Sequence, residues 1–367
     1  MYFHPKGPLV PAYKKFPPTP RLSVKPDSSG IHWETEKGDA GQIDGRWLRE
    51  MCTCSACRHP DTAQKKINVL QLPADSVRPR MAREVDQEGV RGYEVEFRDG
   101  HRTFVPFKML STRDKLETKQ DRAGFVEPQV WDSSISTSPP TVSYSDVQAG
   151  PGMATLLRKI RSHGFAFISD MPATPEASQA LLENIGPIRN THYGGFYDFT
   201  SDLSSKDTAY TAEALEPHTD NTYFTEPAGL QALHMLSHTD GSGGESSLVD
   251  GFKVANDLYR ENDRAYTMLS STGVHAHASG NEGVNVQPAQ PTPVLVHHRE
   301  LGCLQQVRWN TADRGGVATS QRLMGSWYDA ATAFDRKVND KKNQYWFRLE
   351  PGKMLCTFSR VAKENEG

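Results

Sequence analysis

The sequence predicts a mainly β protein with additional helices, arranged as two domains. A chain of 367 residues is long enough for two domains of about 150 residues, or for one domain with an appendage. Apolar residues make up 36% of the chain, which is enough to form a core at this length. Short segments of alternating apolar and polar residues, separated by turn residues, predict strands in both halves.

Charge and hydropathy exclude two classes of protein. Lys and Arg number 42 and Asp and Glu 45, for a net charge of −3, whereas nucleic-acid binders usually carry a clustered basic excess. No run of 18 or more apolar residues occurs, as a membrane-spanning helix would require. We therefore expect neither a nucleic-acid partner nor a membrane partner.

Composition divides the chain into four parts. Residues 1–30 combine prolines with lysines and show no amphipathic pattern, which predicts a disordered tail. Residues 111–150 are polar, with a Ser- and Pro-rich stretch, and predict a linker. Between them, residues 31–110 predict a small β domain, and residues 151–367 predict the larger second domain.

The small domain shows the pattern of a hairpin. Ile31–Trp33 and Tyr93–Phe97 alternate as half-buried strands do. Asp99 and Gly100 predict a tight turn, and Thr103–Val105 returns as the next strand.

The larger domain begins with helices around a buried strand. Apolar residues recur at helical spacing over residues 153–160 and 177–185. Gly164 ends the first helix, and Phe165–Ile168 predicts a short buried strand. The remaining expected elements are strands over Gly229–Leu236 and Ser246–Val249 and helices over Val254–Tyr259 and Leu323–Val338.

Three of the five cysteines form the pattern Cys52-x-Cys54-x-x-Cys57. Too few cysteines remain elsewhere for a disulfide framework, which indicates a reducing compartment. No secretory signal pattern precedes them, so we expect a cytoplasmic or mitochondrial protein. Three thiolates at this spacing can converge on one tetrahedral Zn²⁺, which would stabilise a small domain with a thin core.

The fourth zinc ligand must come from another part of the chain. His101 is the first choice, because the Asp99–Gly100 turn places it at a hairpin tip. His59 is the local competitor, although it follows Cys57 closely and precedes a proline. Three unligated cysteines remain the alternative.

A second candidate metal site is His218-Thr219-Asp220. On a strand, residues two apart point to the same face, so this imidazole and carboxylate can bind one metal. They are two of the three ligands in the facial triad that holds Fe(II) in oxygenases. The chain has 13 histidines, so a His-x-Asp pattern is expected by chance and is weak evidence for a metal site. The residues around it determine whether it is a metal site.

Those neighbours resemble the trimethyllysine and γ-butyrobetaine dioxygenases, Fe(II)/2-oxoglutarate oxygenases of carnitine biosynthesis. The similarity runs from Ile31 to Leu355. The AYT segment at 209–211 and the HTDNTYF run at 218–224 are closer to the trimethyllysine enzyme, whereas the cysteine cluster is closer to the butyrobetaine enzyme. The segments near the iron shape the substrate pocket, so they favour the trimethyllysine enzyme. Further matching segments are Trp47-Leu48-Arg49, Glu226–Gln231, Gly243–Ser246, Leu248–Phe252 and Arg308-Trp309-Asn310.

The resemblance implies a double-stranded β-helix (jelly-roll) oxygenase domain behind a zinc-binding N-terminal β domain, in a homodimer. It implies Fe(II), Zn(II), the co-substrate 2-oxoglutarate and, as a further cofactor, ascorbate. His218 and Asp220 would be the catalytic iron ligands. The implied reaction couples oxidative decarboxylation of 2-oxoglutarate to hydroxylation of Nε-trimethyllysine at its β-carbon. Hydroxylation of γ-butyrobetaine is the alternative.

The implied substrate carries a trimethylammonium group, which aromatic faces recognise by cation–π attraction. By alignment with the family's motifs, Tyr193, Tyr197 and Tyr210 match cage and pocket positions, and Asp207 matches a polar substrate contact. Tyr197 stands where tryptophan is expected, which makes the site similar but not identical. His234 alternates with apolar residues and is expected to be structural.

The resemblance ends near residue 355. Leu349–Leu355 fits the approach to the second iron histidine, but Cys356–Gly367 departs from the pattern, and no histidine follows His298. The arginine that binds 2-oxoglutarate is missing as well, so no residue is assigned to that co-substrate. His297 or His298 is a weak substitute ligand. We therefore expect a C-terminally truncated domain without its last strands, whose activity is open, and a catalytically inactive homologue is the further alternative.

Overall fold

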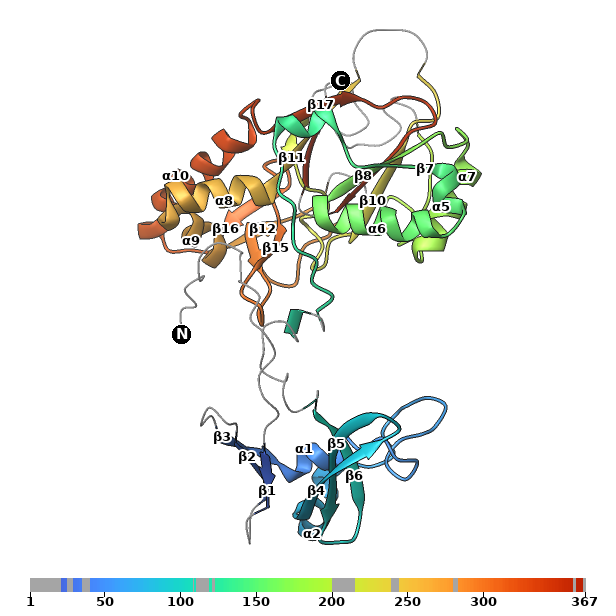
Figure 1. The fold of residues 1–367 in the computed structure, drawn as a ribbon. Helices are drawn as coiled ribbons and strands as arrows, with labels where there is room; N and C mark the ends of the chain where they lie inside the picture. The colour runs from blue at the N-terminus through green and yellow to red at the C-terminus, as the bar shows by residue number, and fades with distance from the viewer. Residues whose placement is uncertain are drawn as a thin grey trace. The chain divides into compact units, whose positions relative to one another are not determined.

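The computed structural model describes residues 21–24, 29–34, 40–107, 109, 119–120, 123–199, 215–238, 244–279, 283–358 and, for the backbone, 361–365. They divide between Phe125 and Val126 into two compact units (Figure 1). Part of the predicted linker therefore belongs to the second unit, where it forms β7 (Thr141–Ser143) and α5 (Tyr144–Gln148). No described helix is long and apolar enough to cross a membrane.

The first unit contains two three-stranded antiparallel sheets. One consists of β1 (Arg21–Ser23), β2 (Gly30–Glu34) and β3 (Ala40–Asp44), and the other of β4 (Pro79–Gln87), β5 (Val90–Phe97) and β6 (Arg102–Pro106). Between the sheets along the chain come α1 (Gly45–Glu50), η1 (Val69–Gln71) and α2 (Ala74–Val77). Alternate residues of β5, namely Tyr93, Val95 and Phe97, share one core with Ile31 and Leu48. The three strands predicted in this region are confirmed.

β1 lies within the segment predicted as a disordered tail. Its Leu22 packs against the core of the first unit, and the Leu22 N–H donates to the Tyr93 hydroxyl at 3.4 Å. These contacts order a short strand that the composition of the segment did not indicate.

The second unit is built on two four-stranded sheets. The first has the order β10 (Leu230–His234), β18 (Met354–Phe358), β8 (Phe165–Ser169) and β7, and the second β17 (Gln344–Arg348), β11 (Glu245–Asp250), β19 (Val361–Asn365) and β9 (Leu215–His218). One apolar cluster joins them, with Phe167 and Leu355 from the first sheet and Leu248 and Tyr345 from the second. The continuous apolar run of β8 is buried, as its composition predicts.

Helices cover the first sheet and form a separate core beside the second. α6 (Pro151–His163) and α7 (Pro175–Ile185) pack against β8 and β18, and α6 ends at Gly164 in the left-handed conformation (φ 84°). The other core surrounds fully buried Trp327. Its helices are α8 (Gly251–Glu261), α9 (Asp263–Ser271) and α10 (Gln321–Val338), with the short strands β12 (Gly273–Ala276), β13 (Thr292–Pro293), β14 (Leu295–His297), β15 (Leu304–Val307) and β16 (Arg314–Val317) nearby.

The segment in which the family resemblance is lost also forms a strand. The backbone of β19 runs antiparallel to both β11 and β9, with Val361 opposite Asp250 and Lys363 opposite His218. β9 carries the first residue of the His-x-Asp motif, so its only partner strand among the described residues comes from this segment.

Candidate functional site

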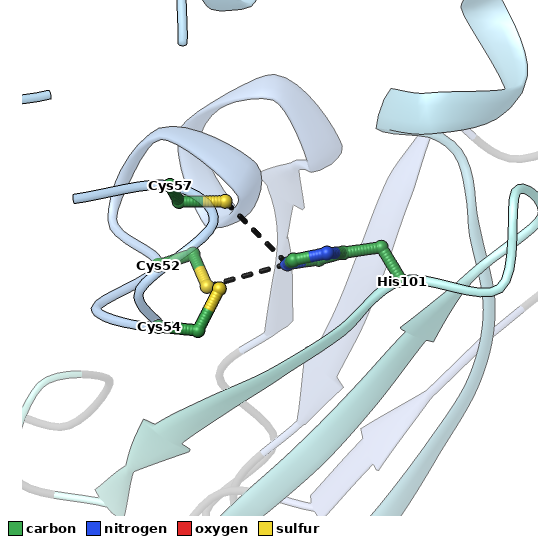
Figure 2. A group of neighbouring side chains, drawn as sticks. All are labelled: Cys52, Cys54, Cys57 and His101. Carbon is green, nitrogen blue, oxygen red and sulfur yellow. Dashed lines mark hydrogen bonds between the residues drawn. The ribbon is translucent and has the colours of Figure 1, made fainter. Parts of the chain in front are cut away.

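The four predicted zinc ligands of the first unit come together (Figure 2). Cys52, Cys54 and Cys57 lie on the loop after α1, and His101 lies at the turn between β5 and β6. Their ligand atoms are all within 4.8 Å of one another. His101 Nε2 is 3.3 Å from Cys52 Sγ and 3.7 Å from Cys57 Sγ. Tetrahedral zinc with bonds of about 2.0–2.3 Å separates its ligand atoms by roughly 3.7 Å, so this donor set fits Zn²⁺.

The hairpin turn holds His101 toward the thiols. Gly100 has φ 85°, a conformation that glycine adopts without strain, and the His101 N–H donates to Asp99 Oδ1 at 2.9 Å. Buried Arg49 places Nη2 3.8 Å from Asp99 Oδ2 and lies over the Phe97 ring. His59 lies outside the cluster, and its Nδ1 accepts from the Asp61 N–H.

The cysteine thiols are electrostatically coupled. Burial, followed by the charge of Cys52, raises the pKa of the Cys57 thiol to about 12. A bound cation reverses this effect, because a coordinating thiol is deprotonated outright. The cluster therefore holds three thiolates most readily around a divalent metal.

The second unit brings His218 and Asp220 together at one point. His218 Nε2 lies 3.2 Å from Asp220 Oδ1. His218 Nδ1 lies 2.8 Å from the Glu216 carbonyl, which can only accept, so Nδ1 donates its proton there and Nε2 is directed at the Asp220 carboxylate. A ring nitrogen and a carboxylate oxygen at this distance share a proton or a cation. Two ligands at right angles on a first-row metal lie about 3 Å apart, so the pair fits a shared metal ion.

The prediction that Asp220 continues the strand is wrong. β9 ends at His218, and Asp220 lies in a turn followed by Asn221 at φ 58°. Thr219, the residue between the two candidate ligands, instead explains why their side chains point the same way. Buried Thr219 donates its N–H to the Trp309 carbonyl at 2.6 Å, and its hydroxyl accepts the Trp309 N–H at 2.8 Å. Because Thr219 is held on one side, its two neighbours face the other.

No third ligand joins this pair within the part of the chain that the structure describes. His297 Nε2 accepts from the Tyr266 hydroxyl at 2.8 Å, and His298 Nδ1 accepts from the Leu301 N–H at 3.1 Å. Neither weak substitute therefore lies with His218 and Asp220.

Of the three tyrosines predicted to form the aromatic cage, the structure describes Tyr193 and Tyr197. The Tyr193 hydroxyl accepts from the Tyr223 hydroxyl at 3.2 Å, and Tyr223 accepts from Asn221 Nδ2 at 3.2 Å. Tyr193 is thus connected to the turn that carries Asp220. Tyr197 is 46% exposed, and its ring lies 5.9 Å from that of Phe199. Two other predicted substrate contacts, Asp207 and Tyr210, lie outside the described residues.

His234 has the surroundings of a structural histidine. It lies on β10, and its Nδ1 is 2.7 Å from the hydroxyl of buried Ser178 on α7. Burial lowers its pKa.

Sequence patterns did not assign a role to Tyr223, although it lies in the motif that carried the resemblance. They also assigned none to Arg308, whose guanidinium contacts the same turn. Both contacts join residues that are far apart in the chain, and residue spacing does not report such pairs.

Comparison with known proteins identifies the family. Residues 128–357 match the family described as taurine catabolism dioxygenase TauD, TfdA family. Residues 22–111 match the family described as gamma-butyrobetaine hydroxylase-like, N-terminal. Trimethyllysine dioxygenase of Neurospora crassa is 39% identical over 84% of this chain and 72% of its own length. The chain belongs to the trimethyllysine dioxygenase family.

Other relatives agree with this family. Trimethyllysine dioxygenase of Meyerozyma guilliermondii is 32% identical over 91% of this chain and 86% of its own length. Human gamma-butyrobetaine dioxygenase is 25% identical over 84% of this chain and 79% of its own length. The closer similarity to the trimethyllysine enzymes, expected from the segments near His218, is therefore confirmed.

Proposed function

We propose that this protein is an Fe(II)- and 2-oxoglutarate-dependent dioxygenase that hydroxylates Nε-trimethyllysine to 3-hydroxy-Nε-trimethyllysine. One observation carries the proposal: His218 Nε2 and the Asp220 carboxylate meet at 3.2 Å in a chain of the trimethyllysine dioxygenase family. Bound Fe(II) would supply O₂ activation and the coupled decarboxylation of 2-oxoglutarate. The protein would hold the metal through these two side chains and orient the substrate.

Recognition of the substrate is proposed to use aromatic faces. A trimethylammonium group cannot donate a hydrogen bond, so ring faces are its best partners. Tyr193 supports this assignment, because the Tyr223 hydroxyl holds its phenol beside the turn that follows Asp220. Tyr197 and Tyr210 complete the proposed cage, and Asp207 is the proposed polar contact.

The first unit is proposed to bind one structural Zn²⁺ through Cys52, Cys54, Cys57 and His101. The donor types, the four-fold count and the spacing support this assignment. Four protein ligands fill all the positions of a tetrahedral ion and leave none open for water or substrate. The ion would therefore stabilise the fold and take no part in the reaction.

The finer architecture is also proposed. Two four-stranded sheets that share one apolar cluster support a double-stranded β-helix. The family resemblance supports a homodimer and ascorbate as a further cofactor.

Succinate formation tests the proposed reaction. The purified protein is incubated with Fe(II), ascorbate, 2-oxoglutarate and either trimethyllysine or γ-butyrobetaine, and succinate and hydroxylated product are quantified by NMR. Trimethyllysine should give the faster turnover. Faster turnover of γ-butyrobetaine would assign the alternative substrate instead.

An inactive, zinc-bearing homologue is the second candidate function. It is favoured by the absence of a third iron ligand beside His218 and Asp220 in the residues described. A protein that binds both betaines or Fe(II) but forms no succinate would have this function.

A further inference from the structure

The loop that follows Asp220 is held by a buried arginine from a distant segment. Arg308 directly follows β15 and is only 8% exposed. Its Nη2 donates to the carbonyls of Thr222 at 2.5 Å and Phe224 at 2.6 Å. Its Nη1 donates to the Thr225 carbonyl at 3.3 Å. One guanidinium thus binds three carbonyls within four consecutive residues.

These carbonyls need an external donor. Asn221 takes a positive φ of 58°, and the following residues form turns, so no regular ladder satisfies the loop. Buried carbonyls without donors carry a high free-energy cost. A guanidinium is suited to the task because its donors form a rigid planar fork. Burial lowers the pKa of Arg308 to about 10, so it stays charged at neutral pH.

The same segment contacts the loop at further points. Trp309 holds Thr219 through backbone and hydroxyl hydrogen bonds. The Thr222 hydroxyl donates to Asp313 Oδ2 at 3.2 Å, and Asn310 Nδ2 donates to the same oxygen at 2.8 Å. The iron-ligand loop therefore lies on a support formed by residues 308–313.

The support is itself anchored. The Arg308 N–H donates to the Val294 carbonyl at 2.8 Å, and the Trp309 ring packs 5.0 Å from that of Phe334 within the core around α10. Motion of Asp220 relative to this core would require the arginine to release its carbonyls.

We propose that Arg308 is a positioning residue for the metal site, which sets the direction of the Asp220 carboxylate through the carbonyls of the following turn. This inference rests on the proposed iron site. Arg308 touches neither candidate ligand, so it acts through the loop and not on the reacting atoms.

Arg308→Gln removes the charge and the fork, and Arg308→Lys keeps the charge alone. Arg189→Gln is the matched control. Arg189 is exposed, donates to the Glu226 carbonyl at 2.7 Å and stacks on the Phe224 ring at 4.5 Å. It is therefore an arginine that contacts the same loop from outside.

The first-unit cluster of Cys52, Cys54, Cys57 and His101 is first saturated with Zn²⁺. Co(II), a spectroscopic substitute for Fe(II), is then titrated into this zinc-loaded full-length protein and followed by calorimetry and by visible absorption. Substitution of an outer support residue typically weakens metal binding by about 10–100-fold, and we expect a loss of at least about tenfold for Arg308→Gln. The spectrum of the saturated complex should shift, which a general loss of stability would not cause. Hydrogen exchange of the peptide spanning 219–225 should accelerate without metal. Arg189→Gln should leave all three readouts at the wild-type values.

Wild-type affinity, spectrum and exchange in Arg308→Gln would overturn the positioning role. If Arg308→Gln loses its circular dichroism, Arg308→Lys decides: a shifted Co(II) spectrum supports the role, and a wild-type spectrum and affinity refute it. A zinc-loaded wild-type protein that binds no Co(II) would overturn the iron assignment and this inference together, whereas normal wild-type binding with unaffected variants overturns this inference alone.

Discussion

Replacement of His101 by alanine tests the zinc site most directly. The change removes one of four converging ligand atoms and leaves a turn whose tip no longer reaches the thiols. Structural zinc binding is worth about 10–16 kcal/mol in small domains. An even share of about 2.5–4 kcal/mol per ligand corresponds to a loss of roughly 10²–10³-fold in affinity.

The free energy of unfolding should fall as the affinity for zinc falls. At fixed free zinc, a hundredfold loss of affinity removes up to about 2.7 kcal/mol of stabilisation when the metal binds only the folded state. The loss should be confined to the first unit, because all four ligands lie there. Zinc content after dialysis, chelator competition and thermal unfolding with and without EDTA measure these effects.

His59→Ala is the matched control for this experiment. His59 is two residues from Cys57 but is exposed and bonded to Asp61. The His59→Ala variant should retain one zinc ion per chain. Wild-type zinc affinity in His101→Ala, or loss of the ion in His59→Ala, would refute His101 as the fourth ligand.

Three further substitutions test the second unit. Thr219→Val should lower the free energy of unfolding by about 1–3 kcal/mol, because it leaves the buried Trp309 N–H without its acceptor. Gly352→Ala should cost about 1–3 kcal/mol, since φ is 81° and the new Cβ would lie 2.9 Å from the Met171 carbonyl oxygen. Burial lowers the pKa of His234 in the folded protein, so the unfolded chain binds more protons below about pH 6.5 and stability falls as the pH drops through that window. His234→Gln should therefore show a smaller fall in melting temperature between pH 7.5 and 5.5, two values on either side of about 6.5.

Each of these changes has a control. Thr219→Ser keeps the hydroxyl and should restore most of the stability. Gly316→Ala meets no atom within 4 Å and should be close to neutral. For His234→Gln, the wild-type protein measured over the same pH range is the reference. Equal losses in a variant and its control would contradict the corresponding contact.

The convergence of the three cysteines and His101 was predictable because its signal is local. Three candidate ligands lie within six residues. The fourth lies on a turn that the Asp99-Gly100 pair predicts. Two further elements were predictable for the same reason. The long helix α10 has apolar residues at helical spacing, and the buried strand β8 is a short continuous apolar run. α9 was not predicted, although Ala265, Tyr266 and Leu269 are buried and Met268 packs against the same core.

The support of the iron-ligand loop was not predictable from spacing. Arg308 and Thr222 are 86 residues apart, and nothing in either local segment reports their contact. The motif Arg308-Trp309-Asn310 indicated family membership without indicating a role. The contact of Arg308 with this turn follows only from the fold, which places the end of β15 against the turn after β9.

The two candidate metal sites differ in what holds their ligands. In the first unit the ligands lie on a hairpin turn and on the loop after α1, outside regular secondary structure, so a metal ion and its ligands would stabilise each other. In the second unit the packing of Trp309 against the core of α10 holds Thr219, and Arg308 holds the turn after it. The direction of Asp220 is thus set by protein contacts before any metal binds. Removal of zinc should therefore lower the stability of the first unit, whereas removal of the iron-site metal should leave the protection of residues 219–225 against hydrogen exchange nearly unchanged.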